Sequence, residues 1–204
     1  MVRTILTRQG STFTARAEEF LTSASDDFHP TDVLEDADGS LLVVDMGAWF
    51  NYGCPTAKIA KPEVKGVILR VRRAAAPRVE DPWGKSLPLE TMSAAELLRL
   101  LDDSRPKVRD RAVNQLVKGG KSAVPELAAA SSRDGKRADS KAISVRSRRQ
   151  TIWALSRIGT PQARAAIRAA LADQDAVVRQ VATHCVGLER DSKALLALRK
   201  MVLD

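Results

Sequence analysis

"LDDSRPKVRDRAVNQL" at residues 101–116 and "LADQDAVVRQVATHCV" at residues 171–186 follow one pattern. Each contains a leucine, an aspartate, a Val-Arg pair, an alanine and a final apolar residue at the same positions. Apolar residues at this spacing lie on one face of an α-helix. A helical pattern that recurs along the chain is typical of repeat proteins, in which helical units stack on one another. The shared positions are Leu101, Asp103, Val108, Arg109, Ala112 and Leu116 in the first copy, and Leu171, Asp173, Val178, Arg179, Ala182 and Val186 in the second.

A third, weaker copy lies between these two. Arg148 precedes Arg179 by 31 residues, and the residues around Arg148 keep part of the pattern. The interval from Arg109 to Arg148 is 39 residues, so the middle unit contains about eight extra residues. The stretch "SSRDGKRADS", residues 131–140, is rich in Gly, Ser and charge, as loops are, and accounts for the insertion.

The segments between the motifs predict a second helix in each unit. Thr160 is a helix N-cap residue followed by Pro161, which loses no helical hydrogen bond at the first position. Ser93 and Glu96 have the spacing of a capping box. We therefore predict antiparallel helical pairs, with helices at 93–103, 106–118, 122–131, 141–157, 161–172, 175–187 and 191–203.

Each motif residue is expected to have a structural role in these pairs. The aspartate lies in an inter-helix turn, where its carboxylate accepts hydrogen bonds from the exposed amides of the next helix. The valine faces the core, and the small alanine lets the paired helices approach closely. The arginine is expected to reach an aspartate or a helix C-terminus in a neighbouring unit. The residues with these roles are Asp103, Val108, Arg109, Ala112, Arg148, Asp173, Val178, Arg179 and Ala182.

This pattern resembles the HEAT family, in particular the short HEAT-like repeats described in phycobilin lyases. The resemblance covers roughly residues 91–204, or about three and a half units. It implies an α-solenoid of helical hairpins that bury their apolar faces by stacking.

The first part of the chain predicts short β-strands instead. Asp38-Gly39 forms a turn signal between two apolar runs, which indicates a β-hairpin. We expect strands at 2–7, 12–16, 33–34, 41–44 and 66–73, and short strands of this kind, four to a sheet, are typical of one propeller blade. The predicted fold class is α+β, with a propeller-blade-like β segment at 1–73, a Pro-rich linker at 74–90 and the α-solenoid at 91–204.

Residues 28–73 carry a second resemblance. The pieces "ADGSLLVVD", "GCPT" and "KPEVKGVILRVRR" resemble the end of the β-propeller in putative membrane-bound dehydrogenases of planctomycetes, a group similar to glucose and sorbosone dehydrogenases. In that group HEAT-like repeats follow the propeller. The resemblance implies a larger redox parent protein, periplasmic or exported, that carries a quinone or a c-type haem elsewhere. We expect no cofactor in this chain and a partner that is another protein or the rest of the parent.

Composition limits the other function classes. Residues 1–90 contain 11 basic and 13 acidic residues, whereas residues 91–204 contain 22 and 12, so the second half has a net charge of +10. The two cysteines, Cys54 and Cys185, form neither a CxxCH haem attachment nor a zinc-type spacing. The chain has no run of 18 apolar residues that would span a membrane, and its first 20 residues do not have the pattern of a secretion signal.

Three groups of side chains have both a structural and a functional interpretation. His29, with Asp32 nearby, is either a general base or a residue that fixes a loop. Cys54 is either a reactive thiol or a structural residue, and the aromatic residues Trp49, Phe50 and Tyr52 form either a binding platform or a plug at the end of a sheet. For His184 the residues nearby supply no second metal ligand, so we expect a surface position.

A basic cluster supports a rival function. Lys and Arg side chains in a helical array can hold a phosphate backbone, as HEAT-like DNA glycosylases show. The alternative is a solvated basic face. The cluster consists of Lys136, Arg137, Lys141, Arg146 and Arg149, with Trp153 as the one aromatic residue.

Two function classes therefore remain. The first is a non-catalytic protein-interaction scaffold within a dehydrogenase-like parent, and the second is a basic repeat protein that binds nucleic acid. We also expect the chain to be a fragment, because the helix at 191–203 has no predicted partner and a single blade has open edges. On that hypothesis the chain exposes apolar surface and self-associates.

Overall fold

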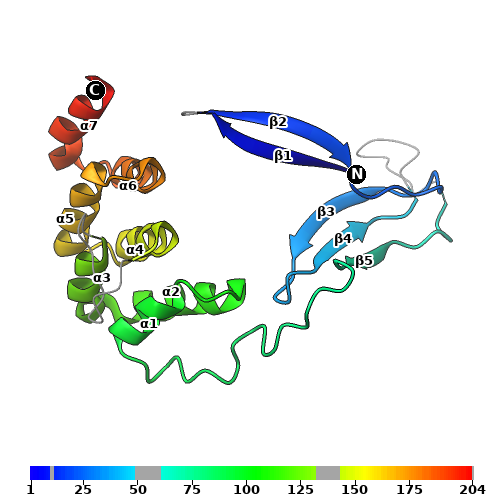
Figure 1. The fold of residues 1–204 in the computed structure, drawn as a ribbon, viewed down its shortest axis with the longest axis horizontal. Coiled ribbons are helices and arrows are strands. Elements are labelled where there is room, and N and C mark those ends of the chain that lie inside the picture. Colours follow the sequence, from blue (N-terminus) through cyan, green and yellow to red (C-terminus); the bar gives the residue numbers. More distant parts are fainter. Residues whose placement is uncertain (10–11, 49–60, 132–142, 204) are drawn as a thin grey trace. The chain divides into compact units, whose positions relative to one another are not determined.

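The computed structural model describes residues 1–9, 12–48, 61–131 and 143–203. The chain divides into two compact units, Met1–Pro77 and Arg78–Asp204. The first contains the strands and the second contains the helices (Figure 1). This arrangement confirms the predicted α+β fold class.

The described residues of the β unit form two small antiparallel sheets. The strands β1 (Val2–Gln9) and β2 (Thr12–Glu19) pair along their whole length. The strands β3 (Pro30–Glu35), β4 (Leu41–Asp45) and β5 (Val67–Val71) form the second sheet in the order β3-β4-β5. All of the predicted strands are therefore present in the described residues.

The turn between β3 and β4 is the predicted hairpin turn. Gly39 has a φ of 78°, a conformation that favours glycine, and its N–H donates to Asp36 O (3.0 Å). The Asp36 N–H donates in turn to Ser40 O (2.8 Å). On the central strand, Val43 is fully buried, as the apolar run at 41–44 predicts.

The expectation of one four-stranded, blade-like sheet is wrong for the described strands. They are divided between a pair and a triplet, and β1 and β2 pair only with each other. The free edge of β3 begins with Pro30, which has no N–H to donate, and the register with β4 shifts between Pro30 and Asp32. An edge with a proline and a bulge is a poor template for a further strand.

The helical unit has two layers. In Figure 1, α1, α3, α5 and α7 form one layer, and α2, α4 and α6 form the other. None of the described helices is long and apolar enough to cross a membrane. The helices are α1 (Ala94–Leu100), α2 (Pro106–Gly119), α3 (Val124–Ser131), α4 (Val145–Ile158), α5 (Pro161–Ala169), α6 (Ala176–Leu188) and α7 (Leu195–Leu203), with 3-10 helices at Gly120–Ala123, Ala170–Ala172 and Ser192–Ala194.

Local capping explains where most of these helices begin. Ser93 and Glu96 form the predicted capping box, and Thr160 Oγ1 accepts from the Ala163 N–H (3.1 Å) ahead of α5. The helix α4 begins later than predicted, because Ser144 caps it by accepting from the Ser147 N–H (3.0 Å). The three 3-10 helices are one-turn segments at the ends of helices that the sequence predicts as continuous.

A single core runs through the helical unit. The motif residues Val108, Ala112, Val178 and Ala182 are fully buried in it. The largest fully buried side chains of the unit are Leu101, Leu116, Leu127, Ile152, Leu155 and Ile167. At the far end, α7 exposes Leu195, Leu196 and Val202, of which Val202 is 85% exposed.

The Pro-rich segment contains turns and irregular backbone. From Arg78 onward it belongs to the helical unit. Leu89 is buried in the helical core and Leu87 packs against that core. The boundary between the two units therefore falls at Pro77, within the segment predicted as a linker.

Candidate interaction surface

One motif arginine connects two consecutive repeats. Arg148 on α4 donates through Nη1 to Ile143 O (2.8 Å), in the turn before its own helix. Its Nε and Nη2 donate to the two carboxylate oxygens of Asp173 (3.0 and 3.1 Å), in the next repeat. The Asp173 side chain is only 1% exposed and also accepts from the Asp175 N–H (2.8 Å). This bidentate ion pair fixes the register of one repeat on the next.

The other two motif arginines make a different contact from the predicted one. Arg109 donates to Asp103 O (2.7 Å), and Arg179 donates to Asp173 O (2.8 Å). They therefore bind their own turns, whereas the prediction placed them against neighbouring units. Helical side chains point toward the helix N-terminus, so each guanidinium meets the carbonyls of the turn that precedes its helix.

Asp103 is bound by a neighbour in its own turn. Its carboxylate accepts from the Arg105 backbone N–H (2.8 Å) and from Arg105 Nε and Nη2 (both 2.9 Å). The hydrogen bonds from the Arg105 side chain hold the pKa of Asp103 below its usual range, although partial burial acts in the opposite direction. Among the described residues, the first turn is thus stabilised locally by Arg105, whereas Asp173 takes part in an ion pair between repeats.

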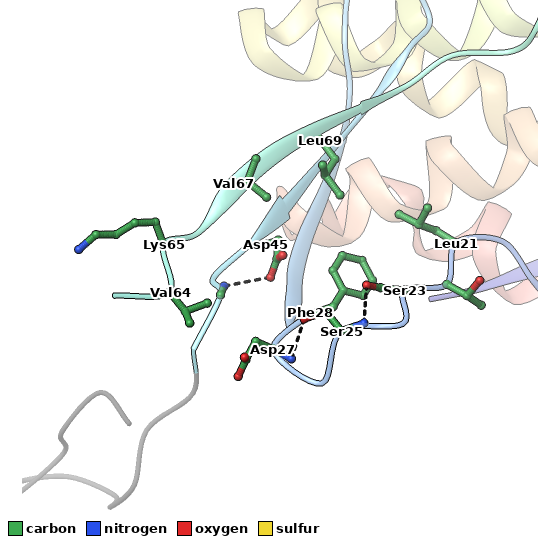
Figure 2. Close-up of a pocket in the computed structure, with 12 residues that line it drawn as sticks. Leu21, Ser23, Ser25, Asp27, Phe28, Asp45, Val64, Lys65, Val67 and Leu69 are labelled. Atoms are coloured by element: carbon green, nitrogen blue, oxygen red, sulfur yellow. Dashed lines mark hydrogen bonds between the residues drawn. The ribbon is translucent and has the colours of Figure 1, made fainter. Parts of the chain in front are cut away.

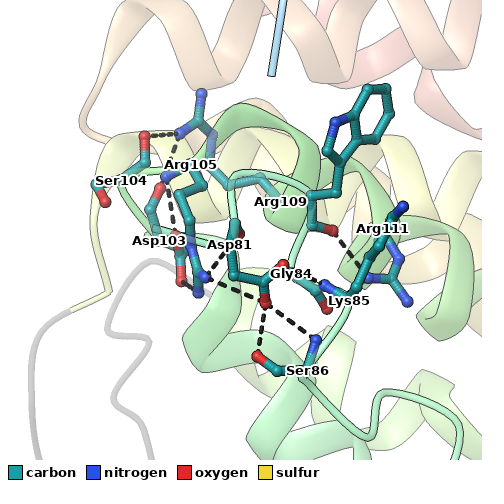
Figure 3. A network of polar contacts seen from close by, with 10 residues as sticks. Asp81, Gly84, Lys85, Ser86, Asp103, Ser104, Arg105, Arg109 and Arg111 are labelled. Atoms are coloured by element: carbon teal, nitrogen blue, oxygen red, sulfur yellow. Dashed lines mark hydrogen bonds and ion pairs between the residues drawn. The ribbon is translucent and has the colours of Figure 1, made fainter. Parts of the chain in front are cut away.

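A short loop before α1 is attached to this turn, as Figure 3 shows. Asp81 accepts from Ser86 Oγ (2.6 Å), the Ser86 N–H (3.0 Å) and the Lys85 N–H (2.7 Å). Arg105 Nη1 donates to Asp81 O (3.1 Å). The hydrogen bonds from Ser86 lower the pKa of Asp81 to about 2, with further contributions from Lys85 and the charge of Arg105.

The same loop presents Trp83 beside α2. Arg111 Nη1 donates to Trp83 O (2.8 Å) and Gly84 O (2.5 Å), and the Lys107 ammonium lies 5.8 Å from the centre of the Trp83 ring. Gly84 has a φ of 63°, and a Cβ there would come within 2.6 Å of Val108 Cγ2. The loop therefore packs closely on α2, while Trp83 remains 45% exposed.

The residues five positions after the three motif arginines form a row across α2, α4 and α6. They are Asn114, Trp153 and His184. Arg157 on α4 donates through Nη1 to Asn114 Oδ1 on α2 (2.9 Å). The rings of Trp153 and His184 meet edge to face, with centroids 5.5 Å apart. These contacts join three repeats into one surface.

Four positions of each repeat share this side of the helix. One lies two residues before the motif arginine, and the others lie one, five and nine residues after it. At 100° per residue, these four positions fall within about 80° of one another around the helix axis. We call the surface that they form the α2–α4–α6 face. It consists of Lys107, Asp110, Asn114 and Lys118 on α2, Arg146, Arg149, Trp153 and Arg157 on α4, and Val177, Gln180, His184 and Leu188 on α6.

The predicted basic cluster falls partly on this face. Arg146 and Arg149 are exposed on it, and Trp153 is half-buried. Lys136, Arg137 and Lys141 lie outside the described residues. Lys107 and Arg157 were not among the residues predicted from the sequence, and His184 was considered only as a metal ligand, although the spacing from the motif arginines places all three beside the predicted cluster.

Comparison with known families agrees with this geometry. A family model for HEAT repeats matches residues 94–187 and again residues 140–204, which together cover more than half of the chain. The chain belongs to the HEAT-repeat family. No curated protein matches the chain at the threshold of significance. The HEAT array is thus the part of the molecule whose family is established, and HEAT repeats typically mediate protein interactions.

Outside the HEAT array, the structure places His29 against a backbone carbonyl. Its Nδ1 lies 2.7 Å from Gly47 O, and its backbone N–H donates to Asp45 Oδ1 (2.9 Å). Asp32 Oδ1 accepts from the Val33 N–H (2.8 Å). The structure therefore brings the Asp45 carboxylate to the backbone N–H of His29.

A small hollow lies next to this loop in the β unit, as Figure 2 shows. Its volume is about 380 Å³, and its lining is mainly apolar, with Leu21, Phe28, Val64, Val67 and Leu69 around it. Asp45 also lines this hollow, and its carboxylate accepts hydrogen bonds from the His29 and Gly47 N–H groups (2.9 and 3.0 Å).

The remaining candidates have ordinary environments or lie outside the described residues. Cys185 is fully buried, and burial raises the pKa of its thiol. His184 is exposed on α6. Cys54 and the aromatic group at 49–52 lie outside the described residues, and the described part of the chain contains no cluster of His, Cys, Asp and Glu that could hold a metal ion.

The inter-repeat ion pair leads to a stability prediction. Arg148→Ala leaves the Asp173 carboxylate buried without its cation, so the free energy of unfolding should fall by about 3–5 kcal/mol. Arg179→Ala loses only bonds to carbonyls and should cost about 1.5–3 kcal/mol. Urea denaturation measures both.

Arg146→Ala is the matched control, because this exposed arginine should change stability by less than about 0.5 kcal/mol. Equal effects of Arg146→Ala and Arg148→Ala would contradict the structural role of the motif arginine. An unchanged Arg179→Ala stability with altered partner binding would assign Arg179 to binding instead.

The loop at Asp81 leads to a prediction about pH. The Asp81 carboxyl has a lower pKa in the folded chain than in the unfolded chain, where the pKa is near 4. The ionised carboxylate therefore stabilises the folded state at pH values above about 4, and this stabilisation is lost as the pH falls toward 2. Ser86→Ala removes the main cause and should raise the Asp81 pKa toward 3.8. Titration of the carboxyl carbon by NMR measures it, with Ser122→Ala as the control. An Asp81 that titrates near 3.8 in the unaltered chain would show that the loop is not held in this way.

Proposed function

We propose that the chain is a non-catalytic protein-interaction scaffold whose binding surface is the α2–α4–α6 face. The observation that carries this proposal is the continuity of that face across three HEAT repeats through the Arg157–Asn114 and Trp153–His184 contacts. Stacked repeats offer an extended surface of this kind, and their buried motif residues leave it free to vary.

We further propose that this scaffold works within a larger, propeller-containing redox protein similar to glucose and sorbosone dehydrogenases. The resemblance of residues 28–73 and the order of a β segment before HEAT repeats support this context. The redox cofactor, a quinone or a c-type haem, would lie elsewhere in the parent, because Cys54 and Cys185 cannot supply the paired cysteines of a c-type haem site. Further propeller strands encoded upstream in the same reading frame would support this context, and a stop codon directly upstream would overturn it.

Nucleic-acid binding is the second candidate function. It is favoured by the positive charge of the face, since α2, α4 and α6 together contain a single carboxylate, Asp110. Binding to a phosphate backbone would weaken steeply with salt, because each contact releases a counterion.

Photo-crosslinking in cells tests the proposed scaffold directly. A photoreactive amino acid replaces Arg149 on the α2–α4–α6 face or, as the control, the exposed Lys121 in the 3-10 helix Gly120–Ala123. The proposal predicts a protein adduct from position 149 and none from position 121. Adducts with RNA or DNA alone would favour the second candidate, and equal protein adducts from both positions would contradict a specific binding face.

A further inference from the structure

The α2–α4–α6 face changes its chemistry from one repeat to the next. Two residues before the motif arginine, the side chain is Lys107 on α2 and Arg146 on α4, but Val177 on α6. Nine residues after the arginine, the side chain is Lys118 on α2 and Arg157 on α4, but Leu188 on α6. Leu188 is 64% exposed. The outer positions of the face are therefore cationic on α2 and α4 and apolar on α6, where Gln180 and His184 lie between half-buried Val177 and exposed Leu188.

The cationic part has little internal compensation. Asp110 lies 3.8 Å from the Lys107 ammonium, and Arg157 donates to the neutral Asn114. Within the described residues, no hydrogen bond or ion pair of the side chain is found for Lys118, Arg146 or Arg149. Such a patch attracts an anionic partner and sets its orientation.

From this change we infer that the α2–α4–α6 face binds an extended acidic–apolar peptide segment of a partner protein. Its carboxylates lie over α2 and α4, and one or two large apolar side chains lie over α6. The inference rests on the proposed scaffold function and specifies its partner. Neighbouring helices are about 8–10 Å apart, so the face accommodates about six to eight extended residues.

Two observations favour a peptide over a nucleic acid. A nucleic acid carries a phosphate at every step along its strand, so it would place charge over Val177 and Leu188 as well as over the arginines. The aromatic rings are also already engaged, since Trp153 packs against His184 and Lys107 lies over Trp83. Base stacking needs free ring faces.

The test uses the full chain and two fluorescent octapeptides. The first is Glu-Asp-Glu-Asp-Gly-Ser-Leu-Phe, made in both sequence orders, and the second replaces Leu-Phe with Ser-Ser. A ten-nucleotide single strand and a twelve-base-pair duplex serve as nucleic-acid probes at the same salt concentration. Fluorescence anisotropy gives Kd for each probe.

The inference predicts a pattern among three variants. Arg149→Glu should weaken binding of both octapeptides about tenfold, because it reverses a charge that faces the carboxylates. Leu188→Ser should weaken only the Leu-Phe octapeptide, again about tenfold, because an apolar contact is lost. Lys121→Glu, which lies off the face, should change neither Kd. Circular dichroism melting confirms that the variants fold, and Arg149→Gln replaces Arg149→Glu if the latter does not.

Three outcomes would overturn the inference. They are tighter binding of either nucleic acid than of the Leu-Phe octapeptide, equal binding of the two octapeptides by the unaltered chain, and no octapeptide binding at all. If position 149 still captures a protein in cells, the scaffold function stands and only the acidic–apolar partner is rejected. If position 149 captures no protein, both proposals fail.

Discussion

The structure of the helical unit depends on arginine side chains that close the turns between helices. Arg109, Arg148 and Arg179 each donate to a carbonyl of the turn that precedes their own helix. These carbonyls have no partner within a helix, and the guanidinium satisfies them; Arg109 and Arg179 also bring their charge close to the end of the preceding helix. Arg148 adds the bidentate bond to buried Asp173, so that one side chain closes its own turn and holds the next repeat.

Each helix that carries a motif arginine has a buried side and an opposite, more exposed side. The buried side carries the valine, the alanine and the later apolar residue, which every repeat needs for stacking. The opposite side contributes little to the core, with Trp153 as the member that packs against it, so most of its residues can differ between repeats without loss of the fold. The face can therefore present Arg146 and Arg149 on α4 but the exposed apolar Leu188 on α6.

The sequence predicted the features that depend on short-range chemistry. The capping box at Ser93 and the N-cap at Thr160 lie where the helices begin, because these bonds join residues three positions apart. The division of the strands between two sheets was missed, since pairing depends on partners far along the chain. The same limit applies to the loop at Asp81, which is attached to α2 through Arg105, 24 residues later. The α2–α4–α6 face is an intermediate case, because its residues follow from the motif but its continuity required the Trp153–His184 and Arg157–Asn114 contacts.

On the proposals above, the motif arginines hold the structure while the arginines of the opposite face bind the partner. A ¹H–¹⁵N NMR spectrum that resolves arginine Nε–H signals tests this division of roles most directly, recorded with and without the Leu-Phe octapeptide. We expect the signals of Arg149 and Arg157 to shift on addition of the peptide, while those of Arg148 and Arg179 stay in place. Shifts of Arg148 and Arg179 with no change at Arg149 and Arg157 would contradict it.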